Sequence, residues 1–344
     1  MTITYADETQ VKGRVYKDLM SISNQTSDIY FAAITQDVNG RFASNLTDGI
    51  LGLSYDTLKT NDVPNFMNQI IKGLAIKDLF SMCTGYEGGS FVLGAIVDDF
   101  HTGDILYTPI VTKGYYSVSM TKIQILNFQK SYSIDTSQYE AFVDSGTTLI
   151  ILPFNVYDAI MFNLQNLCAS DSVLKNLLCE KENIFNTTDK CIHFDSNVFS
   201  KLPDLRFQFR GETPNSVFEL TIPPKYYMRY MPSTEPDYDF CGNFGISYLM
   251  NYDYIILGDV FMRSFYVVFD RENQRIGLAY SQNCGGSIKT PRSSPIAIVG
   301  IGLSFGIVFL GALAMFLIIY FKNKRDRYQH VNLHRNNLNI NDPL

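Results

Sequence analysis

One motif dominates this sequence: Ala141-Phe142-Val143-Asp144-Ser145-Gly146-Thr147-Thr148-Leu149-Ile150. Apolar residues precede Asp144 and resume after the two threonines, which predicts a buried strand, a tight turn and a second apolar strand. Gly146 lets the backbone approach closely within that turn. The hydroxyl groups of Ser145 and Thr147 can hydrogen-bond the carboxylate. The motif therefore predicts a functional carboxylate at the end of a buried strand, with a hydrogen-bonded structural Asp as the alternative.

The composition around this motif favours a sheet-rich protein. The chain has 344 residues, of which 46% are hydrophobic and 18% charged, and its aromatic residues are all Tyr and Phe. This length suffices for two domains with hydrophobic cores, and the abundance of aromatics favours strands over a helical bundle. A net charge of -6 argues against nucleic-acid binding. Because the sequence contains no HExxH, CxxC or phosphate-binding glycine loop, neither a metal nor another cofactor is expected.

A coarse internal repeat indicates two related lobes. The segment Gly49-Ile50-Leu51-Gly52-Leu53 is echoed by Ile255-Ile256-Leu257-Gly258-Asp259, and each contains an apolar pair followed by glycine. We expect each lobe to place such a strand behind a common centre. Short β-prone runs bounded by Gly, Asp and Asn alternate through residues 1–284, as in all-β folds. Helical patterns interrupt them at residues 64–73 and 155–178.

Taken together, these motifs resemble the pepsin-like aspartic proteases over nearly all of residues 1–284. Four segments carry the resemblance in the family's order: a flap hairpin at 3–5 with Gly13, an N-terminal-lobe block at 48–53, the active-site motif at 144–148, and a C-terminal-lobe block at 256–261 with 268–270. The spelling of the motif is most similar to the membrane-anchored branch that includes beta-secretase. The resemblance implies an all-β, bilobal acid protease fold. Residues 1–110 would be the remainder of an incomplete N-terminal lobe, and residues 111–284 the C-terminal lobe.

The resemblance also implies an aspartic endopeptidase that hydrolyses peptide bonds in protein or peptide substrates. In that family two facing aspartates share one proton and activate a water that attacks the scissile carbonyl. Asp144 would be one catalytic residue, and Ser145, Gly146 and Thr147 would support the dyad. Tyr5 would contact the substrate from the flap.

The sequence contains no second Asp-[Ser/Thr]-Gly motif, although the resemblance places one before the flap. We interpret the chain as an N-terminally truncated part of a longer protease, with Met1 internal or mis-assigned. Two alternatives stay open. One is a membrane-anchored, catalytically inactive pseudoprotease that binds peptides. The other is a homodimer that pairs two Asp144 residues, as half-size retroviral proteases do, although the remnant of the first lobe would obstruct it.

Cysteines and glycosylation signals indicate an oxidising, secretory compartment. The sequence has six cysteines, and N-x-[ST] sequons predict glycosylation at Asn24, Asn45 and Asn186. Spacing alone does not determine how six cysteines pair. The family resemblance implies bridges Cys191–Cys241 and Cys83–Cys284, which leaves Cys168–Cys179 as the third.

The C-terminal part predicts a membrane anchor. Residues 296–321 contain no charged side chain and are long enough to span a bilayer with some tilt. A buried core helix would rarely stay uncharged for so long, and a signal peptide would lie at the other end. A lipid-anchor signal would end in its apolar tail, whereas Lys322, Lys324, Arg325 and Arg327 follow this run.

These positive charges predict a cytosolic tail at residues 322–344, and residues 285–295 form a predicted stalk. The expected protein is therefore a single-pass type I membrane protein with its catalytic part luminal or extracellular. Its expected partners are substrates and, through one helix, the lipid bilayer.

Overall fold

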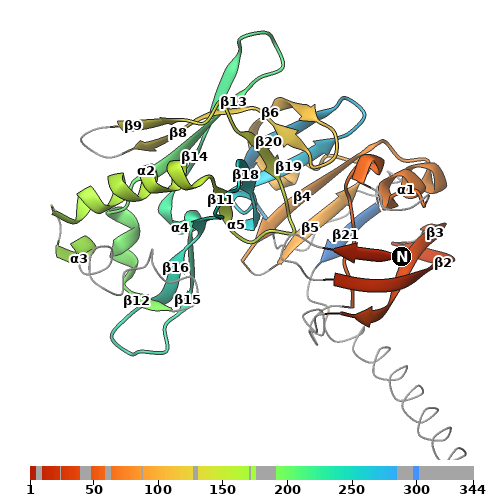
Figure 1. The fold of residues 1–344 in the computed structure, drawn as a ribbon, viewed down its shortest axis with the longest axis horizontal. Coiled ribbons are helices and arrows are strands. Elements are labelled where there is room, and N and C mark those ends of the chain that lie inside the picture. The colour runs from red at the N-terminus through yellow and green to blue at the C-terminus, as the bar shows by residue number, and fades with distance from the viewer. Residues whose placement is uncertain are drawn as a thin grey trace, which may run out of the picture. The chain divides into compact units, whose positions relative to one another are not determined.

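The structure is a computed structural model of the chain. It describes residues 1–4, 10–23, 25–38, 48–58, 63–86, 88–126, 131–169, 172–175, 191–284 and 297–301. These residues fall in one compact unit, residues 1–301, and the second unit, residues 302–344, lies outside them. The described part is mainly β, as the sequence predicts (Figure 1). Strand β6 (His101–Thr112) runs through the predicted lobe boundary at residue 110.

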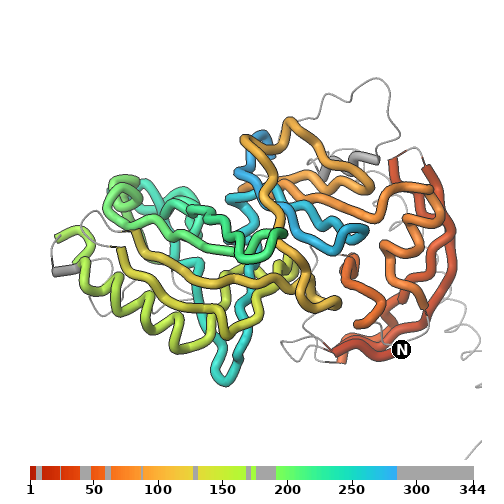
Figure 2. The backbone as a smooth tube through the Cα atoms, turned by 90° about the horizontal axis from the view of Figure 1, so that it is seen from above, coloured from red at the N-terminus to blue at the C-terminus, as the bar shows by residue number. Residues whose placement is uncertain are grey.

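An eleven-stranded sheet forms the centre of the described part. Its strands, in spatial order, are β17 (Ile246–Tyr248), β11 (Ile150–Leu152), β18 (Tyr254–Leu257), β10 (Glu140–Val143), β7 (Ser117–Val118), β6, β20 (Arg275–Ser281), β19 (Phe265–Asp270), β4 (Leu79–Gly85), β5 (Gly88–Leu93) and β21 (Ala297–Ile301). Strands β19 and β20, late in the sequence, lie between the early strands β4 and β6 (Figure 2). The sheet thus joins segments that are far apart in the chain, such as Tyr266 on β19 opposite Cys83 on β4.

Three smaller sheets surround this centre in the described residues. Their strands, in spatial order, are β1 (Thr2–Thr4), β2 (Gln10–Ile22) and β3 (Gln25–Asp37); β12 (Ile192–Phe194), β16 (Phe240–Phe244) and β15 (Met228–Pro232); and β14 (Val217–Ile222), β13 (Asp204–Arg210), β8 (Met120–Leu126) and β9 (Ser131–Asp135).

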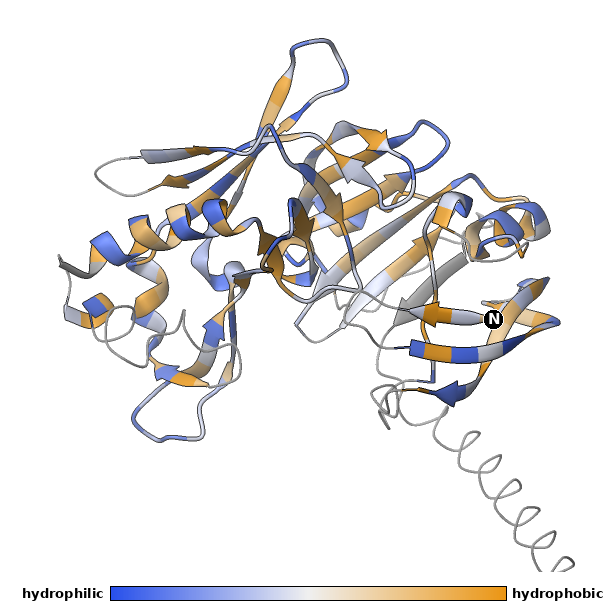
Figure 3. Cartoon of the chain, in the orientation of Figure 1, coloured by the Kyte–Doolittle hydropathy of each residue, from blue (hydrophilic) through white to orange (hydrophobic). Residues whose placement is uncertain are grey.

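Two of the described helices correspond to the helical patterns in the sequence. Helix α1 (Phe66–Leu74) begins after Asn65, whose side chain accepts a hydrogen bond from the amide of Asn68 at 2.9 Å. Helix α2 (Phe154–Gln165) alternates hydrophobic and hydrophilic residues along its length (Figure 3). It ends earlier than predicted, at Gln165, and passes into a 3-10 turn at Asn166–Ala169. The short helices are α3 (Ser172–Leu174), α4 (Pro224–Tyr227) and α5 (Asp259–Met262).

The core is rich in aromatic contacts between the central strands. Phe80 on β4 stacks on its cross-strand neighbour Phe269 on β19, with ring centroids 4.4 Å apart. Tyr116 meets both rings edge-on, at 5.8 Å from Phe80 and 5.0 Å from Phe269. Such pairs contribute about 0.5–1.5 kcal/mol beyond the area they bury. These three aromatic residues also belong to the lining of the cleft described below.

The structure contains the disulfides Cys83–Cys284 and Cys191–Cys241, which are two of the three pairings that the resemblance implied. Cys83 is fully buried and packs with Val92, Phe100 and Tyr266. The bridge joins residues 201 positions apart, so it ties the segment that follows β20 to β4. The pairing Cys168–Cys179 lies outside the described side chains and stays a prediction. The same holds for the sequons Asn24, Asn45 and Asn186.

The predicted membrane span differs from the structure at its beginning. Residues 297–301 form β21, which pairs antiparallel with β5 from Ala297 opposite Leu93 to Ile301 opposite Gly89. The backbone there is paired because β5 offers its edge to a further strand. Among the residues that the structure describes, no helix has the length and apolar character needed to cross a membrane. Residues 302–321, the stalk at 285–295 and the tail at 322–344 lie outside the described part.

The turn between β19 and β20 gives a pH-dependent prediction. Asp270 is buried and accepts hydrogen bonds from the Arg275 Nε at 2.8 Å and the Asn273 amide at 3.1 Å. Burial alone would raise the pKa of this carboxyl, but these hydrogen bonds outweigh burial and lower the pKa below 3.8. A lowered pKa in the folded state stabilises the protein above the unfolded value, and this contribution is lost as the pH falls through the folded value.

We therefore expect Asp270→Asn to be less stable than wild type at pH 6 and to lose less of its stability between about pH 5 and pH 2. Thermal unfolding followed by circular dichroism across this range measures both effects. Asp135→Asn is the comparison variant, because the pKa of Asp135 is also lowered, by hydrogen bonds from Ser137, but this side chain is exposed. Solvent screens its interactions, so we expect a smaller change in the pH profile than for Asp270→Asn. Parallel pH profiles for wild type and Asp270→Asn would contradict the prediction.

Candidate active site

The Asp144 turn is held by strands from two distant parts of the chain. Strand β18 lies between β10, with which it is parallel, and β11, with which it is antiparallel. Both neighbours align with Leu257 at the end of β18, through Val143 and Ile150 respectively. The turn from residue 144 to 149 therefore crosses the end of β18, and the Asp144 amide donates to the Leu257 carbonyl at 3.2 Å.

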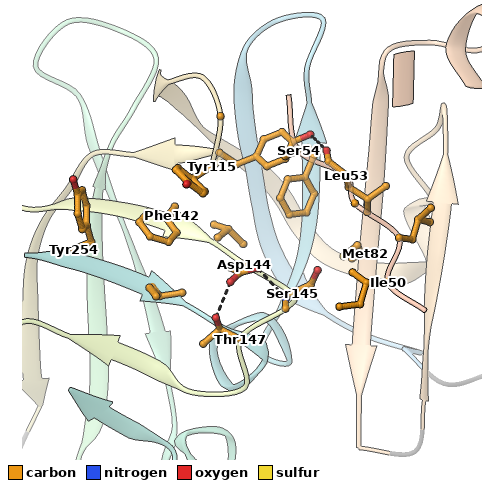
Figure 4. Close-up of a pocket in the computed structure, with 18 of the residues that line it drawn as sticks. Ile50, Leu53, Ser54, Met82, Tyr115, Phe142, Asp144, Ser145, Thr147 and Tyr254 are labelled. Carbon is orange, nitrogen blue, oxygen red and sulfur yellow. Dashed lines mark hydrogen bonds between the residues drawn. The ribbon is translucent and has the colours of Figure 1, made fainter. Parts of the chain in front are cut away.

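The two oxygens of the Asp144 carboxylate each accept a hydrogen bond from the turn itself. The Gly146 amide donates to Oδ1 at 2.9 Å, and the Thr147 hydroxyl donates to Oδ2 at 2.7 Å (Figure 4). A methyl group on Gly146 would lie 3.1 Å from Oδ1, so the turn closes tightly around the carboxylate. The side chain of Asp144 is half-buried, whereas Ser145 is exposed and makes no described hydrogen bond to it. The structure therefore orients this carboxylate through Gly146 and Thr147.

The base of the turn is fixed by the segment that follows β18. The Asp259 amide donates to the Thr147 carbonyl at 2.8 Å, and the Val260 amide donates to the Thr148 carbonyl at 2.9 Å. The Asp259 carboxylate pairs with Arg263, which directly follows α5. Asp259 thus has a structural role, and the first amides of α5 hold the turn that carries Asp144.

Asp144 lies in a cleft of about 820 Å³. One side of the cleft is formed by residues 49–54, which we call the cleft wall. Met82 lies on the same side. On the other side are the aromatic residues Tyr115, Phe142, Tyr252 and Tyr254. Figure 4 shows the Asp144 carboxylate between these two sides. Sequence reasoning missed the aromatic side, for which the only signal is the pair of tyrosines around Asp253.

The described lining of the cleft contains one further carboxylate, Glu140. It lies on β10, and its Oε1 accepts a hydrogen bond from the Thr112 hydroxyl. Among the described lining residues, none places a carboxylate on the cleft wall opposite Asp144. Within the same part of the chain, no cluster of His, Cys, Asp or Glu is arranged to hold a metal ion.

The predicted flap is described only on its two arms. Strands β1 and β2 pair antiparallel, with Ile3 opposite Val11 and Thr4 opposite Gln10. Tyr5 lies outside the described residues, so its role at the substrate stays a prediction.

Only one of the two segments of the internal repeat forms a strand. Residues 255–257 belong to β18, whereas residues 49–53 form no strand.

The chain belongs to the eukaryotic aspartyl protease family, whose sequence profile matches residues 1–281. It is 28% identical over 316 residues to a beta-secretase of Strongylocentrotus purpuratus, covering 81% of this chain and 55% of that protein. It is 28% identical over 284 residues to cathepsin D of Dictyostelium discoideum, covering 81% and 67% respectively. It is 33% identical over 237 residues to pepsin II-1 of Oryctolagus cuniculus, covering 67% and 53%. The chain thus spans about half to two thirds of the length of these relatives.

Proposed function

We propose that the complete gene product is an aspartic endopeptidase in which Asp144 is one of two catalytic carboxylates. The observation that carries this proposal is the Asp144 carboxylate, which is oriented by Gly146 and Thr147 on the floor of a cleft. In the proposed reaction an ionised carboxylate takes a proton from a bound water, and this water attacks the peptide carbonyl. The second carboxyl, in its protonated form, donates to the developing oxyanion.

The second carboxylate would come from outside these 344 residues. Residues 49–53 support this part of the proposal, since they pair with no strand in the described part of the chain, whereas their counterpart β18 lies between two strands whose connecting turn carries Asp144. A strand–turn–strand seated in the same way on residues 49–53 would bring a carboxylate to the wall that faces Asp144. We expect extended peptides with apolar side chains as substrates, because aromatic and aliphatic residues line both sides of the cleft.

The alternative is a catalytically inactive pseudoprotease that binds peptides in the same cleft. It is favoured by the described lining, in which Asp144 has no carboxylate opposite it. Incubating the purified complete gene product with fluorogenic apolar peptides between about pH 3 and 7 separates the two functions. Turnover supports the endopeptidase. Saturable binding without turnover overturns it and supports the pseudoprotease.

A substitution at Thr147 tests whether the turn orients a working carboxylate. Thr147→Val removes the hydroxyl that donates to Asp144 Oδ2 and keeps the shape of the side chain. A hydrogen bond to a charged group contributes about 1.5–3 kcal/mol, so we expect kcat to fall about tenfold or more. Thr147→Ser keeps the donor and should retain most of the activity. An equal loss of kcat in both variants would show that the activity depends on the packing of the Thr147 side chain and not on its hydroxyl group.

We also propose that the protein is anchored by residues 302–321, the part of the uncharged run that follows β21, as a single-pass type I membrane protein with its cleft luminal or extracellular. The uncharged run, the basic residues after it and the three sequons support this orientation. Alkaline extraction of membranes from expressing cells, combined with enzymatic deglycosylation, tests it. Release by alkali, or no mobility shift on deglycosylation, would contradict the proposal.

A further inference from the structure

A buried arginine connects the turn after β19 to the cleft wall. The side chain of Arg271 is 3% exposed, and its Nε lies 3.2 Å from Asp78 Oδ1. Its Nη2 donates to Asn68 Oδ1 at 2.8 Å, and its guanidinium lies over the ring of Tyr55 at 4.8 Å. Arg271 therefore contacts helix α1, the start of β4 and the residue that follows the cleft wall, but it does not itself line the cleft.

One route from Arg271 to the wall passes through amide and carboxylate side chains. Asn68 donates through Nδ2 to Asp56 Oδ2 at 2.7 Å, and Asp56 Oδ1 accepts from the Asn65 amide at 2.8 Å. The Asn65 side chain in turn donates to the backbone carbonyl of Ser54. Because each link is a hydrogen bond between partly buried groups, the guanidinium fixes the position of the last residue of the wall.

A second route passes through aromatic rings. The Tyr55 ring, which carries the guanidinium on one side, contacts Tyr116 with centroids 5.0 Å apart. The Tyr116 hydroxyl donates to the Leu53 carbonyl at 2.5 Å. Leu53 and Ser54 are therefore both held from outside the wall, by two routes that meet at Arg271.

These routes matter because no strand among the residues that the structure describes pairs with the wall. Residues 49–53 form no strand, and Ile50 and Leu51 are 62% and 48% exposed. The wall is nevertheless the side of the cleft that faces Asp144 (Figure 4). Its distance from the carboxylate is thus determined at its C-terminal end, where the Arg271 contacts converge.

We propose that Arg271 is a positioning residue that holds the cleft wall at the distance from Asp144 required to bind an extended peptide. Arginine suits this role because its planar group can pair with a carboxylate, donate to an amide and stack on a ring at once. The part of the inference that concerns peptides rests on the proposed function. The part that concerns the wall does not.

The test compares Arg271→Met with Arg275→Met. Arg275 is a matched control, because it lies near the same turn, pairs with Asp270 and Glu212, and stacks on Tyr107, with no described contact to the wall. Limited proteolysis by an added protease that cuts after leucine and tyrosine, with mass spectrometry of the products, reports on Leu53 and Tyr55. Both variants are made in the Asp144→Asn background, so that any cleavage comes from the added enzyme.

We expect Arg271→Met to increase the cleavage rate at Leu53 and Tyr55 at least fivefold over Arg275→Met, with Arg271→Lys between them. With Asp144 intact, Arg271→Met should raise the KM for a peptide about tenfold while kcat changes less. Equal proteolysis of the two Met variants would overturn the inference, whether or not the protein cleaves peptides. Turnover that is absent already in wild type would overturn the proposed function alone, and the proteolysis result would still decide the role of Arg271.

Discussion

Replacing Asp144 by asparagine is expected to reduce peptide hydrolysis by the complete gene product at least about 10²–10⁴-fold. Asparagine has the shape of aspartate, and its single side-chain oxygen can still accept the hydrogen bond from the Gly146 amide. Its NH2 group cannot accept the hydrogen bond from the Thr147 hydroxyl, and the side chain cannot take up the proton of the attacking water. The loss should therefore appear in kcat, with little change in KM for the peptide. Steady-state kinetics on a fluorogenic apolar peptide measures both parameters.

Asp259→Asn is the control for this experiment. Asp259 lies close in sequence to β18 and carries a carboxylate, but that carboxylate pairs with Arg263, which follows α5. We expect this variant to keep activity within a few-fold of wild type and to unfold at a slightly lower temperature. If Asp144→Asn retains more than about a tenth of the wild-type kcat, Asp144 is not a catalytic base or acid.

The second large effect is expected at Gly258, where β18 meets the Asp144 turn. A methyl group at this position would lie 2.3 Å from the Leu149 carbonyl oxygen and 2.4 Å from the Thr147 carbonyl oxygen. Both atoms belong to the backbone, so the turn would have to move. We expect Gly258→Ala to lower the free energy of unfolding by about 1–3 kcal/mol or more, and to lower activity because the moved backbone carries the Asp144 carboxylate.

Gly52→Ala is the matched control for stability. Gly52 also follows an apolar pair in the internal repeat, but a methyl group there would meet nothing within 4 Å. Chemical denaturation of both variants measures the difference in the free energy of unfolding. If Gly258→Ala is as stable as Gly52→Ala, the backbone can move without loss of unfolding free energy. That result would contradict the tight packing of the turn.

The sequence predicted the Asp144 turn well because the signal is local. Apolar residues on both sides specify the two strands, and Gly146 and Thr147 supply donors within three residues of the carboxylate. The sequence also predicted a mainly β chain, since β-prone runs alternate with turn residues throughout. Ser145 is exposed and makes no described hydrogen bond to the carboxylate, so its role in supporting the dyad stays a prediction.

The sequence was less informative where the secondary structure of a segment depends on the strands that pair with it. The repeat at residues 49–53 reads like that at 255–259, yet only the second is a strand, because β10 and β11 pair with it. Residues 297–301 read as the start of a membrane helix, yet they pair with the edge of β5. An apolar run becomes a strand when a partner edge is present, and its own composition does not contain that information.

By itself the sequence determined the family, the mainly β architecture and the carboxylate that we propose as catalytic, because each follows from residues adjacent in the chain. Only the tertiary structure decided what faces that carboxylate. Contacts between segments far apart in sequence form the aromatic side of the cleft and place the wall at residues 49–54. They also bring Arg271 to Asn68 on α1. Such contacts are set by the packing of the whole sheet, in which β19 and β20 lie between β4 and β6, and no local pattern encodes that order.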